Sequence, residues 1–169
     1  MLKYFVSTFL AVLFLGTVVC NAGDNKSTKS LIPDLAYYSI GFAGEVAKLL
    51  GIGSPSGEVR IDEYTTQKYW NDCIATPGFN GHTQLLMNVY NNGYLESIAL
   101  RFVSTSKWKE TGQMWGLPSH YKFVQDINNG KVYKSTGLQA NFLLSISPII
   151  YDKESKLCHK VYVWQMSKE

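Results

Sequence analysis

The side chains best suited to chemistry are two cysteines, Cys73 and Cys158, and three histidines, His82, His120 and His159. A cysteine thiolate beside a histidine is a nucleophile, and several such groups together could hold zinc. The histidines are scattered, and the chain has no His-Glu-x-x-His, Cys-x-x-Cys or Gly-x-Ser-x-Gly motif and no glycine-rich phosphate loop. We therefore expect no metal site and no cofactor.

Cys73 and Cys158 also fit a structural role. Two thiols in an exported chain favour a disulfide, and the N-terminal segment described below predicts export. The bridge would close a loop of about 85 residues, which in the chain-entropy model stabilises a fold by about 4–5 kcal/mol. The alternative is a pair of buried free thiols.

A long loop is the best candidate for a binding surface. Residues 104–119 contain Trp108, Met114 and Trp115, and connections of this length often carry function. If exposed, these side chains would anchor a protein or glycan partner. In the alternative, both indole rings fold back and close the open end of the fold.

The elements that must position these groups are clearest at the C-terminus. Apolar residues occupy every second position of residues 138–146, which predicts a strand with one buried face, and residues 157–166 predict the returning strand. Residues 94–103 and 121–127 also alternate. Residues 128–130, Asn-Asn-Gly, predict a tight hairpin turn. An isolated hairpin is marginal in water, so this sheet needs a partner layer.

Three helices are predicted to supply that layer. Apolar residues recur at three and four positions in residues 34–49, and similar spacing favours helices at residues 63–75 and 82–91. Helices followed by strands predict an α+β fold. We expect three N-terminal helices packed on a curved antiparallel sheet of four to five strands, the cone of NTF2-like and cystatin-like domains.

The first residues predict a secretory signal peptide. Lys3 precedes an apolar run at residues 5–19, and small residues lead to an expected cleavage site after Ala22. Residues 23–33 are polar and predict a flexible leader, and residues 34–169 form one domain. The alternatives are an uncleaved N-terminal anchor and a lipoprotein modified at Cys20. We expect a periplasmic or secreted protein.

The composition narrows the partners. The chain has 169 residues and a net charge of +3, with 17% charged and 14% aromatic residues. Nucleic-acid binding needs clustered positive charge, and the sequence has no basic run. A protein partner in the cell envelope is the expectation, without a small-molecule cofactor, and a homo-oligomer is compatible with the sequence.

One resemblance implies catalysis. The pair Asp72-Cys73, followed by His120 and later by Asn129-Gly130, resembles the residue order of NlpC/P60 peptidoglycan peptidases. It implies a secreted Cys-His cell-wall peptidase in which Cys73 is the nucleophile and His120 its base. Cys73 would lie at the C-terminal end of the expected helix 63–75, where the helix dipole does not favour a thiolate, so we prefer a disulfide or core thiol there.

A second resemblance implies binding. Three stretches are similar to the IcmL-like (DotI/IcmL) family, namely Thr76-Pro77-Gly78-Phe79, Asn92-Gly93-Tyr94-Leu95-Glu96-Ser97-Ile98 and Pro148-Ile149-Ile150-Tyr151. Members form the periplasmic part of type IVB secretion and conjugation machines. The resemblance implies an NTF2-like periplasmic domain that assembles with protein partners. Our preferred interpretation is an exported, non-enzymatic protein-binding domain. The alternatives are the peptidase and a secreted inhibitor or immunity-type binder.

Overall fold

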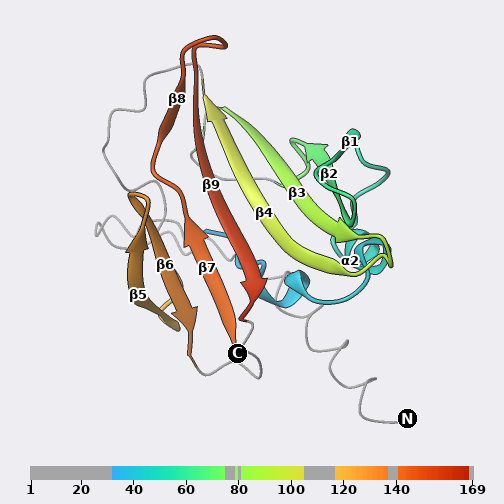
Figure 1. Cartoon of the computed structure of the whole chain (residues 1–169), viewed down its shortest axis with the longest axis horizontal. Helices are drawn as coiled ribbons and strands as arrows, with labels where there is room; N and C mark the ends of the chain where they lie inside the picture. Colours follow the sequence, from blue (N-terminus) through green and yellow to red (C-terminus); the bar gives the residue numbers. More distant parts are fainter. Residues whose placement is uncertain (1–31, 75–78, 80, 105–116, 137–140, 168–169) are drawn as a thin grey trace, which may run out of the picture.

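The computed structural model describes residues 32–74, 79, 81–104, 117–136 and 141–167 (Figure 1). The elements within them are η1 (Ala36–Ser39), α2 (Ala43–Leu49), β1 (Gly57–Arg60), β2 (Thr65–Asn71), β3 (His82–Tyr90), β4 (Leu95–Ser104), β5 (Tyr121–Ile127), β6 (Gly130–Ser135), β7 (Phe142–Ile146), β8 (Ile150–Asp152) and β9 (Leu157–Met166). The strands form one antiparallel sheet in the order β1-β2-β3-β4-β9-β7-β6-β5, with β8 paired to β9 beside this path.

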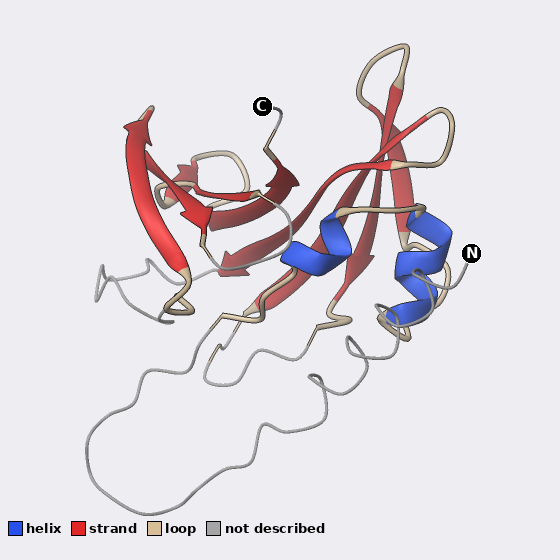
Figure 2. Cartoon of the chain, turned by 90° about the horizontal axis from the view of Figure 1, so that it is seen from below, coloured by secondary structure: helices blue, strands red, loops and turns tan. Residues whose placement is uncertain are grey.

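The sheet is strongly curved, and its hollow holds the two helical elements (Figure 2). The short helix η1 packs against β4 and β9, the two central strands. The side chains that fill this concave side are apolar and almost fully buried, among them Leu100, Phe102, Phe142, Leu144 and Trp164. The N-terminal segment therefore covers the concave face of the sheet. The side chains at the alternating positions of each strand lie on the convex face.

The C-terminal strands were predicted correctly. β9 spans Leu157–Met166 and pairs with β4 on one side and with β7 and β8 on the other. Phe142 and Leu144 face the core as the alternation required, while Leu138 lies outside the described residues. The turn before β6 also forms as expected, since Asn128 and Asn129 adopt positive φ angles of 50° and 63°.

The predicted α+β cone is wrong. Nine strands form where four to five were expected, and the described residues contain one α-helix and one 3-10 turn in place of three helices. No helix forms in residues 63–74 or 82–91, because β2 and β3 lie there instead. Along β3 the residues Thr83, Leu85, Met87 and Val89 are buried and their neighbours are not, which is the period of a strand.

The first predicted helix is split in two. Gly41 lies between η1 and α2 with a φ of 111°, a conformation that L residues rarely adopt. Phe42 then forms a β-bridge with Tyr94, and the Leu95 N–H donates to the Gly41 carbonyl. Pairing with the start of β4 therefore replaces a helical turn. No helix of the described residues is long and apolar enough to cross a bilayer. The expected signal peptide, residues 1–22, lies outside them.

Candidate functional site

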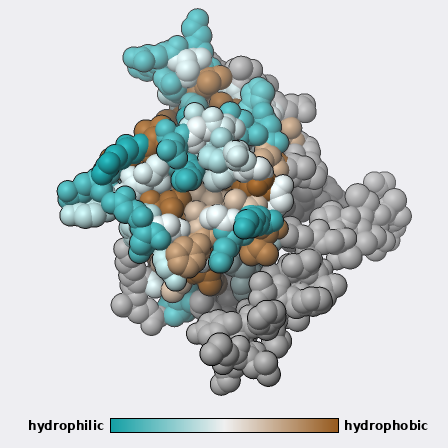
Figure 3. Space-filling view, turned by 90° about the vertical axis from the view of Figure 1, so that its right-hand side faces the viewer, coloured by the Kyte–Doolittle hydropathy of each residue, from teal (hydrophilic) through white to brown (hydrophobic). Residues whose placement is uncertain are grey.

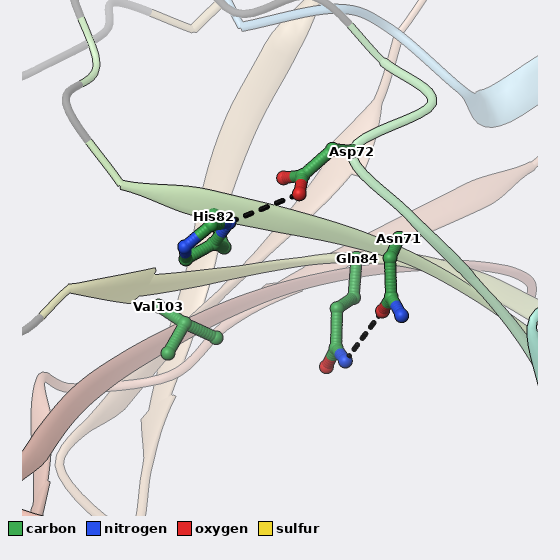
Figure 4. A pocket seen from close by; sticks show the side chains of 5 residues that line it. All are labelled: Asn71, Asp72, His82, Gln84 and Val103. Carbon is green, nitrogen blue, oxygen red and sulfur yellow. Dashed lines mark hydrogen bonds and ion pairs between the residues drawn. The ribbon is translucent and has the colours of Figure 1, made fainter.

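A cleft of ≈ 410 Å³ opens where β2 ends and β3 begins. It is lined by Asn71, Asp72, His82, Gln84 and Val103 (Figure 4). The antiparallel register sets Asn71 opposite Gln84, and His82 opposite Val103. The residues on one face of three neighbouring strands thus converge on the convex side of the sheet.

Asp72 and His82 form an acid–imidazole pair at this cleft. Asp72 has a φ of 50°, and its Oδ2 lies 3.0 Å from His82 Nδ1. The Thr83 N–H donates to Asp72 Oδ1 at 2.8 Å. The hydrogen bond with His82, followed by that from Thr83, holds the pKa of Asp72 below its ordinary value. Both side chains are largely exposed, so the pair contributes little to stability.

A row of hydrogen-bonded side chains continues from the cleft across the sheet. Gln84 Nε2 donates to Asn71 Oδ1 at 2.9 Å, and Arg101 Nη1 donates to Gln84 Oε1 at 3.3 Å. Arg101 Nε and Nη2 lie 3.2 and 3.0 Å from His159 Nδ1. Within the described residues no carboxylate forms an ion pair with Arg101. Arg101 is half-buried, and its guanidinium joins Gln84 of β3 to His159 of β9.

His159 serves as the acceptor at the end of this row. Burial lowers the pKa of the His159 imidazole, and the neighbouring Arg101 lowers it further, while Asp152 opposes both effects. A neutral imidazole keeps one nitrogen free to accept a hydrogen bond. The cleft itself is lined by the Asn71 and Gln84 carboxamides, the Asp72 carboxylate and the exposed His82 imidazole. The nearby hydroxyl of Thr83 is held by the carbonyl of Ile74.

A second polar cluster lies at the other end of the sheet. Asp34 Oδ2 lies 2.9 Å from His120 Nε2, and the Tyr121 hydroxyl donates to Asp34 Oδ1 at 2.8 Å. The Ala36 N–H donates to the same oxygen at 3.0 Å. Burial, and then the Asp34 charge, raise the pKa of Tyr121 well above its ordinary value. These hydrogen bonds connect the start of η1 to the start of β5.

The expected disulfide is wrong, because Cys73 and Cys158 are both free. Cys73 follows β2 and Cys158 lies in β9, and the sheet order places β3 and β4 between those strands. Three strand spacings amount to about 14 Å, and the Cα atoms of a disulfide lie within about 7 Å. Mainly through burial, the pKa of the Cys73 thiol is raised.

The remaining candidate residues are dispersed. His120 contacts Asp34 and its ring lies tilted against that of Tyr121, whereas Cys73 packs at the margin of the core on the β2 side. Trp108, Met114 and Trp115 lie outside the described residues. Sequence reasoning missed the roles of Asp34, Arg101 and the Asp72–His82 pair. Period two in residues 82–90 was the signal that places His82 and Gln84 on one face of a strand.

Among the described residues, no group of three or more His, Cys, Asp or Glu side chains could hold a metal ion. No protein-family model, curated protein or solved structure matches the chain.

Proposed function

We propose that the protein is an exported, non-enzymatic domain that binds a protein partner in the cell envelope, either in the periplasm or outside the cell. The observation that carries this proposal is the β5–β6 hairpin. Phe123, Val124 and Ile127 are 54%, 50% and 48% exposed, and every residue from Lys122 to Asn129 is exposed. Large apolar side chains on both faces of one strand are typical of a surface that another protein covers.

The hairpin is well placed for such a contact. Among the described residues β5 is the last strand of the sheet, and its neighbour in the strand order is β6. The Phe123 ring meets the Tyr133 ring edge-on, with centroids 5.8 Å apart, so it is held in place although exposed. By contrast, the face that carries α2 and β1 shows its hydrophobic residues as separate patches among hydrophilic ones (Figure 3). We therefore place the partner at β5.

The chemistry of the thiol supports binding over catalysis. A thiol nucleophile must ionise, and burial opposes ionisation of Cys73. His120 meanwhile holds Asp34. The Cys-His peptidase thus has less support than the binding domain. The resemblance to IcmL-like proteins suggests a type IVB secretion or conjugation apparatus as the most specific setting, and a secreted inhibitor or immunity-type binder would use the same surface.

The test is site-specific photo-crosslinking in the host cell. A photoreactive residue at Lys122, which is exposed on β5, should give a discrete adduct with an envelope protein that mass spectrometry can identify. The double variant Phe123→Ser/Ile127→Ser should abolish the adduct, because it removes the apolar anchors. The matched control is Ile150→Ser/Tyr151→Ser on β8, which removes similarly exposed apolar side chains elsewhere. Equal loss in both variants, or no adduct with the parent chain, would contradict the proposal.

A further inference from the structure

Within the part of the chain that the structure describes, β1 is a free edge of the sheet, at the opposite end from β5. The Ile61 N–H donates to the Thr65 carbonyl at 3.0 Å, just beyond the paired residues of β1 and β2. In an antiparallel pair, alternate residues bond to the neighbouring strand. Val59 and Gly57 therefore bond to β2. Glu58 and Arg60 direct their backbone N–H and C=O groups away from the sheet, where they can pair with another strand.

The two edges of the sheet differ in regularity. The register between β5 and β6 shifts between Phe123 and Gln125, so Val124 is the extra residue of a β-bulge. Bulges interrupt the row of outward backbone groups and are a common protection against edge pairing. The register of β1 on β2 runs without a shift from Gly57 to Arg60. β1 is thus the edge whose backbone is regular enough to accept a further strand.

We propose that two copies of this chain pair through β1, antiparallel, about a two-fold axis at Val59. Glu58 of each copy then lies opposite Arg60 of the other, and their outward N–H and C=O groups bond on both sides of the axis. The interface is isologous, so every contact occurs twice. It uses a surface apart from β5 and does not depend on the envelope partner proposed above.

The charges of β1 select this register. Glu58 already lies 3.6 Å from Lys68 on the adjacent strand, and Arg60 of the second copy would flank it on its other side. Opposite charges directly across two strands stabilise the pairing, and like charges weaken it. A shift of the second copy by two residues sets Glu58 against Glu58 or Arg60 against Arg60. Only the register centred on Val59 pairs each carboxylate with a guanidinium.

The other face of β1 supplies apolar contacts. Val59 is 58% exposed and would meet Val59 of the second copy on the axis. Ile61, 52% exposed, would lie opposite Gly57 of the second copy. The space that a side chain at Gly57 would need is filled by the ring of Tyr69. Ile61 would thus pack on that ring, and the pairing would cover two exposed aliphatic side chains of each copy.

Sedimentation equilibrium of the full chain tests this pairing. A short edge gives a small interface, and we expect a monomer–dimer equilibrium with a dissociation constant on the order of 100 μM. Glu58→Pro removes an outward N–H while the bonds from Val59 and Gly57 to β2 remain, so it should leave a folded monomer. A parent chain that stays monomeric at every concentration would overturn the proposal.

Charge reversal tests the proposed register of the pairing more specifically. Glu58→Arg and Arg60→Glu should each weaken self-association about tenfold, because like charges then oppose each other twice. An equimolar mixture of the two variants should dimerise like the parent, since each carboxylate again meets a guanidinium. Arg60 also donates to the carbonyls of Asp62 and Glu63, so unchanged unfolding of Arg60→Glu is confirmed first. A mixture that stays monomeric would overturn the proposed register.

Dimerisation through β1 can be tested independently of the envelope partner proposed at β5. Phe123→Ser/Ile127→Ser removes the anchors of β5 and should leave the dissociation constant of the dimer unchanged. Glu58→Pro should in turn leave the crosslink from Lys122 intact. Loss of dimerisation in the β5 variant would contradict pairing through β1, whereas loss of the crosslink alone bears on the proposed function.

Discussion

Asp34 and His120 are separated by 86 residues in the sequence, and Asp34 Oδ2 lies 2.9 Å from His120 Nε2. The other carboxylate oxygen accepts hydrogen bonds from the Tyr121 hydroxyl and the Ala36 N–H. One side chain therefore joins the segment that enters the concave face to the strand at the far edge of the sheet. The contact therefore connects the N-terminal segment that covers the concave face to the edge of the curved sheet.

Replacing Asp34 by Ala should lower the free energy of unfolding by about 2 kcal/mol, because the buried Tyr121 hydroxyl loses its acceptor. Urea denaturation at neutral pH measures this. The control is Asp126→Ala, an exposed carboxylate on β5, which should change the free energy of unfolding by less than about 0.5 kcal/mol. If both variants lose the same stability, the Asp34 cluster does not hold the fold together.

Tyr162 should make the fold sensitive to alkali. Burial raises its pKa from 10.0 to about 12 in the folded chain. A raised folded-state pKa means that the stabilisation is complete below pH 10.0 and is lost as the pH rises toward about 12. A shift of this size corresponds to about 2–3 kcal/mol.

The measurement is the free energy of unfolding between neutral pH and the alkaline limit. Tyr162→Phe should show a shallower alkaline decline than the parent chain, whatever its stability at neutral pH. Tyr94→Phe removes an exposed hydroxyl and should follow the parent curve. Some alkaline loss should persist in Tyr162→Phe, because burial also raises the pKa of Tyr121. Parallel curves for the parent and Tyr162→Phe would contradict the prediction.

The predictable part of the fold is the part where one periodicity dominates. In β7 the buried residues alternate without competition, and Phe142 and Leu144 form the core as expected. In β3 two patterns overlap. Leu85, Leu86, Val89 and Tyr90 fit a helix face, and the alternation from Thr83 to Val89 fits a strand. Pairing with β4 decides between them, and local sequence does not contain that information.

The site could not be assembled from the sequence for the same reason. Asp72 and His82 meet only when β2 and β3 are strands joined in a hairpin, and a helix over either would separate them. Arg101 and His159 lie on β4 and β9, which were predicted as strands, yet their order in the sheet was not. The disulfide prediction was wrong for the same reason, because the strand order separates the two cysteines. Topology, more than element type, set the limit of sequence reasoning.

The free thiols give a direct check on that topology. Denatured without reductant, the chain should be alkylated at both Cys73 and Cys158, because the sheet keeps them apart. A reductant should leave the unfolding midpoint unchanged, and Cys73→Ala should cost about 1 kcal/mol, the usual loss for a partly buried side chain. Mass spectrometry and urea denaturation make these measurements. A bridge between the two residues would require a different strand order.

The polar row predicts a coupling between Arg101 and His159. Burial is the larger cause of the low pKa of His159, and the guanidinium adds to it. Arg101→Gln should therefore raise the pKa of His159 but leave it below the ordinary value of 6.5, since the burial remains. Titration of the imidazole signals by NMR measures the change, and Lys68→Gln, which removes a cation on β2, should leave the His159 curve in place.

The lowered pKa of His159 also determines how the stability of the fold changes as the pH falls. A folded-state pKa below the unfolded value means that neutral His159 adds stability above pH 6.5, and that this stability is lost as the pH falls through the folded-state pKa. The Arg101→Gln variant should lose less stability over this range, because its imidazole takes up a proton more readily. If its His159 titrates as in the parent chain, the bonds of 3.0 and 3.2 Å between the two side chains do not control the imidazole.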